Sequence, residues 1–189
     1  VVNDPLVILG IAGSLRKESF NRALLRAAQE LTPEGARMET LELDGIPPFN
    51  QDEETNPHPR VVELKQRVRA ADAILFVTPE YNYSIPGVLK NAIDCGSRPY
   101  GDSAWSGKPV AIMGASIGGQ GTSRAQYHLR QTFVFLNMYP VNQPEVMVSN
   151  AHKRFDQEGK LTDETSIKLV QQLLSELVNW TKRLSNGAR

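Results

Sequence analysis

Three short runs of apolar residues interrupt an otherwise mixed sequence. They extend from Leu6 to Ala12, from Ala73 to Val77 and from Val110 to Met113. Continuous apolar runs of this length are typical of parallel strands that are covered on both faces. The segment from Arg37 to Leu43 mixes apolar and charged positions, which predicts a less buried strand at an edge of the sheet. A further short strand is expected at Val146–Val148.

Between these strands, apolar residues recur at helical spacing. This spacing predicts helices that begin near Phe20, Val61, Pro86, Ser123 and Ile167. Pro86 suits the first turn of its helix, because that position needs no backbone N–H donor. The dipeptide Asn186-Gly187 is a stop signal for the last helix.

The alternation of strands and helices over residues 1–189 predicts a single α/β domain with a doubly wound, five-stranded parallel sheet and helices on both faces. A second strand at the edge fits the flavodoxin-like order 2-1-3-4-5, whereas the longer Rossmann order would place it inside the sheet. In the predicted order, the ligand crevice opens between the ends of strands one and three. The loops after those two strands are therefore the first candidates for a site.

Composition excludes several classes of function. The chain has 189 residues and a formal net charge of zero, so it has no general attraction for nucleic acid or an anionic membrane. No apolar run approaches the roughly 18–20 residues of a membrane span. The single cysteine excludes an internal disulfide, and the N-terminus lacks the pattern of a signal peptide, so we expect a cytoplasmic protein. Without ligand spacing, His58, His128 and His152 predict no metal site.

The loop after the first strand is rich in groups that bind anions. Residues 13–21 have the sequence Gly-Ser-Leu-Arg-Lys-Glu-Ser-Phe-Asn. Ser14, Ser19 and Asn21 are expected to donate hydrogen bonds to a phosphate, and Arg16 to add a charge-assisted contact at a helix N-terminus. The loop has neither G-x-x-x-x-G-K-[ST] nor G-x-G-x-x-G. The alternative is that Ser19 or Asn21 only caps the helix and that Arg16 is solvated.

Two further loops belong to the same predicted edge of the sheet. Thr78–Gly87 contains two tyrosines, an asparagine and prolines that restrict its backbone, so its peptide groups suit the edge of a planar heteroaromatic ring. Gly114–Gly121 is rich in glycine, which permits close approach of the backbone to a ligand. From the pattern alone, each loop is equally well interpreted as a structural turn.

Gly13–Arg16 with Ser19–Asn21, and the long segment Pro79–Asp94, resemble the NADPH-dependent FMN reductase family. Within that family the chain is most similar to bacterial chromate and quinone reductases, and Arg124–Gln131 fits the same subgroup. The resemblance covers nearly the whole chain and implies a flavodoxin-like fold with non-covalently bound FMN. One departure is Cys95, where the family often has tryptophan; we interpret this thiol as buried and inert.

The resemblance also implies which residues bind FMN. It assigns the phosphate to Ser14, Arg16, Lys17, Glu18, Ser19, Phe20 and Asn21. It assigns the isoalloxazine ring to Pro79, Glu80, Tyr81, Asn82 and Tyr83, with Ser116 completing the site. No side chain is expected to act as a catalyst, because the cofactor carries the reaction. Glu80 is expected to contribute its backbone or to face solvent.

The activity implied by the resemblance is a two-step reduction through FMN. NADPH or NADH delivers hydride, the nicotinamide leaves, and an acceptor such as a quinone, chromate, an azo compound or another oxidised metal ion takes its place. One alternative is a flavodoxin-like electron carrier or redox-sensing module without turnover of its own, which the neutral charge disfavours. Another is a Rossmann dehydrogenase that uses dissociable NAD alone.

Assembly is suggested by the segment Thr132–Tyr139, which is apolar around more than one helical face. This pattern predicts a homodimer or homotetramer; the alternative is a deeply buried helix. The resemblance implies polar contacts between subunits from Arg124, Tyr127 and Glu145, with Tyr83 close to the boundary.

Overall fold

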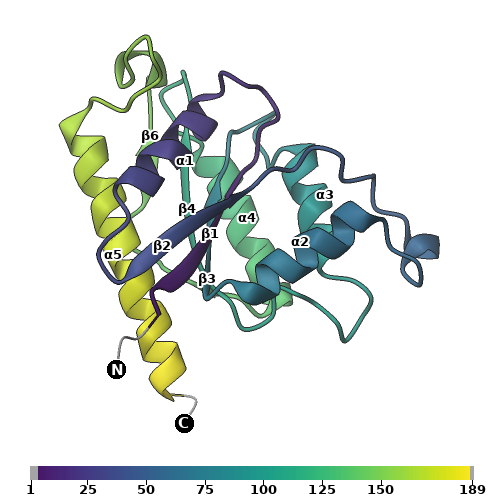
Figure 1. Cartoon of the computed structure of the whole chain (residues 1–189). Coiled ribbons are helices and arrows are strands. Elements are labelled where there is room, and N and C mark those ends of the chain that lie inside the picture. The colour runs from purple at the N-terminus through teal and green to yellow at the C-terminus, as the bar shows by residue number, and fades with distance from the viewer. Residues whose placement is uncertain (1–3, 188–189) are drawn as a thin grey trace.

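A parallel sheet lies between two layers of helices in the computed structural model, which describes residues 4–187 (Figure 1). The helices are α1 (Phe20–Glu30), α2 (Pro59–Ala70), α3 (Gly87–Gly96), α4 (Ser123–Leu136) and α5 (Glu164–Gly187), with short 3₁₀ turns at η1 (Gln51–Glu53) and η2 (Ala151–Lys153). Helices α1 and α5 cover one face of the sheet, and α2, α3 and α4 cover the other. This arrangement confirms the predicted doubly wound α/β fold.

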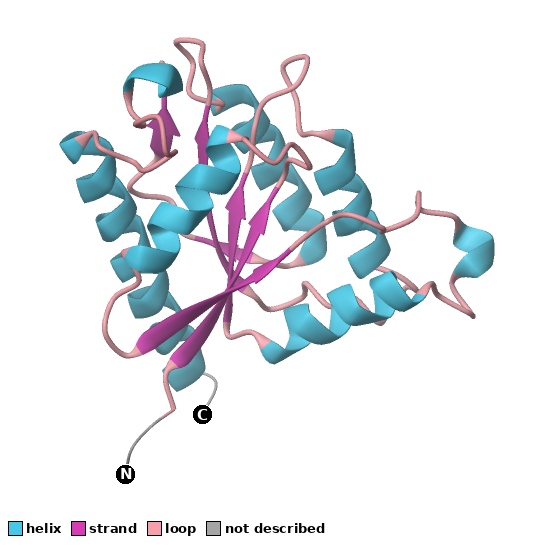
Figure 2. Cartoon of the chain, turned by 45° about the horizontal axis from the view of Figure 1, so that its top comes forward, coloured by secondary structure: helices cyan, strands magenta, loops and turns pink. Residues whose placement is uncertain are grey.

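The strands of the sheet all pair in parallel. They are β1 (Leu6–Ala12), β2 (Ala36–Leu41), β3 (Ala73–Val77), β4 (Pro109–Ala115), β5 (Tyr139–Pro140) and β6 (Val146–Val148). Their order in space is β2-β1-β3-β4-β5, and β6 also pairs with β4. The predicted order is therefore confirmed, with β2 at the edge. In Figure 2, the strands converge and the loops at their carboxyl ends gather at one end of the sheet.

Two details of the sheet differ from the prediction. The expected fifth strand is divided, because β5 pairs with β4 at Pro109 and Val110 while β6 pairs with it from Met113 to Ala115. The sheet of the described residues therefore has six strands instead of five. The edge strand β2 ends at Leu41, two positions before the predicted boundary at Leu43. Leu43 is buried beyond the end of the ladder, so its apolar character reflects packing and not strand pairing.

The core follows from the alternation of side chains along each strand. In β1, Ile8 and Ala12 pack with residues of α1 and α5, whereas Leu9 and Ile11 pack with residues of α2 and α3. All four side chains are buried. Burial of one leucine or isoleucine side chain contributes about 1.5–3 kcal/mol, so this strand anchors both helical layers.

Helix α5 differs from the prediction at its C-terminal end. It continues through Gly187, so the predicted stop at Asn186-Gly187 lies inside the helix. At its other end, Oδ2 of Asp163 accepts hydrogen bonds from the backbone N–H and the hydroxyl of Ser166, at 2.9 and 2.7 Å. These bonds hold the pKa of Asp163 below its ordinary value, because they favour the carboxylate. Asp163 is therefore the N-terminal cap of α5.

Within residues 4–187, no helix has both the length and the hydropathy that crossing a membrane requires. The same part of the chain holds no cluster of three or more His, Cys, Asp or Glu side chains that could bind a metal ion.

Candidate functional site

The loops after β1, β3 and β4 meet at the carboxyl edge of the sheet. Hydrogen bonds continue the ladder past the strand ends, from the Gly13 N–H to the Val77 carbonyl and from the Thr78 N–H to the Met113 carbonyl, both at 2.9 Å. The hydroxyl groups of Ser14 and Tyr81 lie 3.4 Å apart and join the first loop to the second. The parallel order of the strands therefore brings together the three loops that the sequence singled out.

The loop 13–19 presents a row of open hydrogen-bond donors. Among the described residues, no acceptor pairs with the backbone N–H groups of Leu15, Lys17, Glu18 and Phe20. Ser19 caps α1, since its Oγ accepts a hydrogen bond from the Asn21 N–H at 3.2 Å. Arg16, Lys17 and Glu18 are exposed. A capped helix N-terminus with open N–H groups and an adjacent guanidinium suits an anion.

Asn21 has a structural bond that the sequence did not reveal. Its side-chain amide donates to the Ala115 carbonyl at 2.9 Å and accepts from the Ala115 N–H at 2.8 Å. The residue is only 3% exposed, so its carboxamide is committed to the end of β4. Sequence analysis expected this side chain to donate to a phosphate; in the structure it instead joins the start of α1 to the third loop.

The second loop forms a tight turn that stands out from the sheet edge. The backbones of Tyr81 and Ser84 exchange two hydrogen bonds, at 3.1 and 3.0 Å. Between them, Asn82 and Tyr83 have φ values of 51° and 64°, in the left-handed region. Both tyrosine side chains are largely exposed, Tyr81 at 50% and Tyr83 at 67%. The turn therefore presents two aromatic rings and unpaired peptide groups at the edge of the site.

Glu80 does not face solvent, in contrast to the expectation. Its side chain is only 8% exposed and forms an ion pair with Arg124 of α4. Its Oε2 also accepts hydrogen bonds from the backbone N–H groups of Arg124 and Ala125, at 3.1 and 3.3 Å. Hydrogen bonding to this carboxylate raises the pKa of Arg124. The sequence offered one signal for this contact, namely an acidic residue beside a motif and an arginine at the start of a helix.

The third loop is shaped by close packing. A side chain at Gly114 would place its Cβ 2.0 Å from the Thr122 hydroxyl oxygen, so only glycine fits there. The Oγ of Ser116 accepts a hydrogen bond from the Gly118 N–H at 3.1 Å and retains its own hydrogen for donation. Ser116 thus lies on the same edge as the first two loops, as the interpretation of the site requires.

The polar residues expected between subunits already have partners within one chain. The Tyr127 hydroxyl donates to Glu145 at 2.8 Å, and this contact raises the pKa of Tyr127. The guanidinium of Arg124 pairs with Glu80 and lies 3.6 Å from the centre of the Tyr83 ring. The apolar end of α4 is different, because Val134 and Phe135 are 84% and 79% exposed. The alternative of a deeply buried helix therefore does not describe this end of α4 within the chain.

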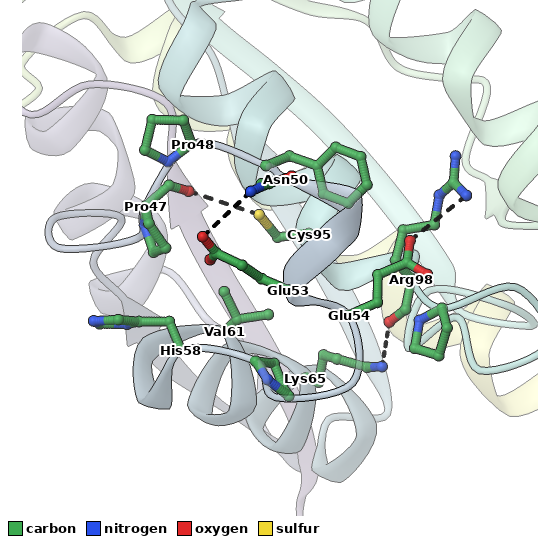
Figure 3. A pocket seen from close by; sticks show the side chains of 13 residues that line it. Pro47, Pro48, Asn50, Glu53, Glu54, His58, Val61, Lys65, Cys95 and Arg98 are labelled. Atoms are coloured by element: carbon green, nitrogen blue, oxygen red, sulfur yellow. Dashed lines mark hydrogen bonds and ion pairs between the residues drawn. The ribbon is translucent and has the colours of Figure 1, made fainter.

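Cys95 lies away from these loops, in a small pocket between the 46–59 loop, α2 and the end of α3 (Figure 3). The pocket has a volume of about 50 Å³. The thiol is 5% exposed and lies 3.8 Å from the Pro47 carbonyl. Burial raises its pKa, which disfavours the reactive thiolate. These properties agree with the interpretation of Cys95 as a buried residue.

Together, the sheet order and the three loops define a flavodoxin-like α/β protein with a mononucleotide site at its sheet edge. Its relatives specify the class further. The chain belongs to the NADPH-dependent FMN reductase family, which matches residues 6–153.

Individual relatives align over almost the full length. An NAD(P)H-dependent FMN reductase of Pseudomonas aeruginosa is 52% identical over 97% of this chain and 99% of its own. A quinone reductase of Pseudomonas putida is 44% identical over 91% of this chain and 92% of its own. Among solved structures, the flavoenzyme NAD(P)H:acceptor oxidoreductase FerB of Paracoccus denitrificans superposes with a TM-score of 0.87 at 34% identity, over 94% of this chain and 98% of its own.

Family membership makes the chain an oxidoreductase with FMN as cofactor and NADPH or NADH as reductant. The residues at the sheet edge fit this cofactor. A terminal phosphate needs several donors at one point, which the open N–H groups of the first loop and Arg16 supply. A flavin ring needs a flat, partly apolar edge with peptide groups, which the Tyr81–Ser84 turn supplies.

Proposed function

We propose that this chain reduces quinones with electrons from NADPH or NADH that pass through bound FMN. The observation that carries the proposal is the contact between Ser14 and Tyr81, which joins a phosphate-type loop to an aromatic turn at one sheet edge. The names of two relatives, a quinone reductase of Pseudomonas putida and an NADPH:quinone oxidoreductase of Arabidopsis thaliana, support quinones as acceptors.

For the cofactor site we propose two groups of residues. The phosphate is held by the loop and first turn of α1, that is by Ser14, Arg16, Lys17, Glu18, Ser19, Phe20 and Asn21. The ring lies against Pro79, Glu80, Tyr81, Asn82 and Tyr83, with Ser116 opposite. Several of these contribute backbone groups, since the side chains of Asn21 and Glu80 are bonded to other parts of the chain.

Bound FMN supplies the redox chemistry, namely acceptance of a hydride and delivery of electrons to the second substrate. The protein contributes position and electrostatics. Arg16 and the N-terminus of α1 neutralise the charge of the phosphate. Peptide N–H groups of the Tyr81–Ser84 turn stabilise negative charge on the ring edge, because they are fixed before the reaction begins. The exposed tyrosines leave one side open to the two substrates in turn.

Other acceptors are part of the same proposal. A shallow, exposed site discriminates weakly among oxidants, so chromate, azo compounds and other oxidised metal ions are expected to react more slowly than quinones. We also propose a homodimer or homotetramer, supported by the exposed Val134 and Phe135, and a cytoplasmic location, supported by the single buried cysteine.

Anaerobic stopped-flow absorbance tests this function. NADPH is expected to bleach the flavin absorbance, and a second mix with p-benzoquinone is expected to restore it, each at a rate at least equal to turnover. Steady-state double-reciprocal plots are then parallel. Flavin that is not bleached by NADPH or NADH would exclude the reductase and favour an electron carrier. A kcat/KM for chromate above that for p-benzoquinone would overturn the choice of acceptor.

A further inference from the structure

Helix α4 depends on a distant carboxylate for its N-terminal cap. The residue at its own cap position, Thr122, has a φ of 73° and makes no capping bond with its side chain. The Thr122 hydroxyl instead accepts a hydrogen bond from the Gln126 side chain at 3.1 Å. Glu80, 44 residues before Arg124, accepts from the first free N–H groups of the helix. The carboxylate also favours the positive end of the helix dipole.

The same carboxylate begins a chain of contacts that fixes the Tyr81–Ser84 turn on α4. Its Oε1 accepts from Nε of Arg124 at 2.6 Å. The Arg124 guanidinium covers the ring of Tyr83, with 3.6 Å between its central carbon and the ring centre. At the far side of the turn, Ser84 Oγ lies 3.0 Å from Nδ1 of His128, also on α4. The turn is therefore bonded to one helix at both of its ends.

This attachment matters because the turn has a costly backbone. Asn82 and Tyr83 both have positive φ, and a non-glycine residue in this region costs of the order of 1–3 kcal/mol in a strained case. Asparagine tolerates the left-handed region, but tyrosine does so less well. Such a conformation persists only where its surroundings determine it, and the surroundings here are the contacts to α4.

We propose that the Glu80 carboxylate is a positioning group for the flavin ring: it fixes the Tyr81–Ser84 turn against α4 and thereby presets the backbone that meets the ring. This proposal rests on the proposed function, in which that turn holds the isoalloxazine. The side chain acts through the N-terminus of α4 and Arg124. Glu80 is therefore a positioning residue and not a catalytic one.

Three variants separate the parts of this role. Glu80→Ala removes the cap and the ion pair, and we expect FMN to bind about tenfold or more weakly. Glu80→Gln keeps one oxygen acceptor and loses the charge, so an intermediate loss is expected. Arg124→Ala leaves the two backbone bonds to Glu80 intact and is expected to cost less affinity than Glu80→Ala.

A matched control is available at the start of α5. Asp163 also caps a helix N-terminus and also pairs with an arginine, Arg154, but it lies outside the three site loops. Asp163→Ala and Asp163→Asn therefore reproduce the loss of stability that follows when a capping carboxylate is removed. They are expected to lower the Tm of the flavin-free protein as the Glu80 variants do, with FMN affinity unchanged.

The experiment measures FMN affinity by fluorescence titration, the Tm of the flavin-free protein, and the midpoint potential and visible circular dichroism of the bound flavin. The proposal is supported if Glu80→Ala weakens FMN binding and shifts both flavin signals, if Glu80→Gln restores part of each, and if the Asp163 variants move only Tm. Wild-type FMN affinity and flavin signals in Glu80→Ala would overturn it while leaving the proposed function intact. A wild-type protein that binds no FMN would overturn both.

Discussion

Asn21 and Ala115 are 94 residues apart in the chain and exchange two buried hydrogen bonds. The carboxamide of Asn21 mimics a peptide group, so it pairs with the last residue of β4 as a neighbouring strand would. This pair joins the first turn of α1 to the start of the glycine-rich loop. The spacing between the phosphate-type loop and Ser116 is therefore determined by one side chain.

Asn21→Ala is expected to destabilise the protein by about 2–4 kcal/mol, because it removes two hydrogen bonds and leaves buried backbone groups of Ala115 unpaired. Urea unfolding followed by circular dichroism measures this loss. Gln29→Ala is the control, since Gln29 lies on the same helix and forms only a long, exposed contact of 3.5 Å to Met38. Equal effects of the two variants would contradict the role given to the Asn21–Ala115 pair.

Arg16→Ala is expected to weaken FMN binding by about 1.5–3 kcal/mol, since a charge-assisted contact to the phosphate is lost. The fold is not expected to change, because Arg16 is exposed. Flavin content after dialysis and a fluorescence titration measure the effect. Arg183→Ala removes an exposed arginine from the distant end of α5 and is expected to bind FMN normally. Full retention of flavin by Arg16→Ala would show that the phosphate is held elsewhere.

The pH dependence of stability has an expected contribution from Asp163. Hydrogen bonds from Ser166 lower its folded-state pKa below the ordinary 3.8, so the carboxylate stabilises the fold above that value and loses this effect as the pH falls through the folded pKa. Asp163→Asn keeps an acceptor but cannot ionise. The difference in urea midpoint between wild type and Asp163→Asn is therefore expected to shrink as the pH is lowered from 7 to below 4. Glu176→Gln, an exposed change on the same helix, should show no such trend.

Phe135→Glu is expected to shift the assembly toward the monomer. Phe135 and Val134 are exposed on α4, and a buried aromatic residue at an interface contributes about 2 kcal/mol or more. Light scattering coupled to size exclusion, over a range of protein concentrations, measures the change. Gln172→Glu places the same charge on an exposed position of α5 and should leave the mass unchanged. A wild-type monomer at all concentrations would remove the proposed assembly.

Much of the fold follows from local pattern. The apolar runs of β1, β3 and β4 and the mixed pattern of β2 predict the buried and edge positions, because burial on two faces demands an apolar side chain at every position. The division of the last strand position into β5 and β6 was not predictable. Its pairing depends on how each short segment meets β4, and two or three residues contain too little pattern to show it.

The sequence alone determined the order of the strands and the three loops at their carboxyl edge, since these depend on hydrophobic periodicity and on motifs that are contiguous in the chain. Only the tertiary structure decided what Glu80 and Asn21 do. Each bonds to a partner more than 40 residues away, Arg124 for Glu80 and Ala115 for Asn21. The partner of a polar side chain is set by which backbone groups the fold leaves unpaired nearby, and a helix N-terminus or a strand end becomes a partner only once the sheet has assembled.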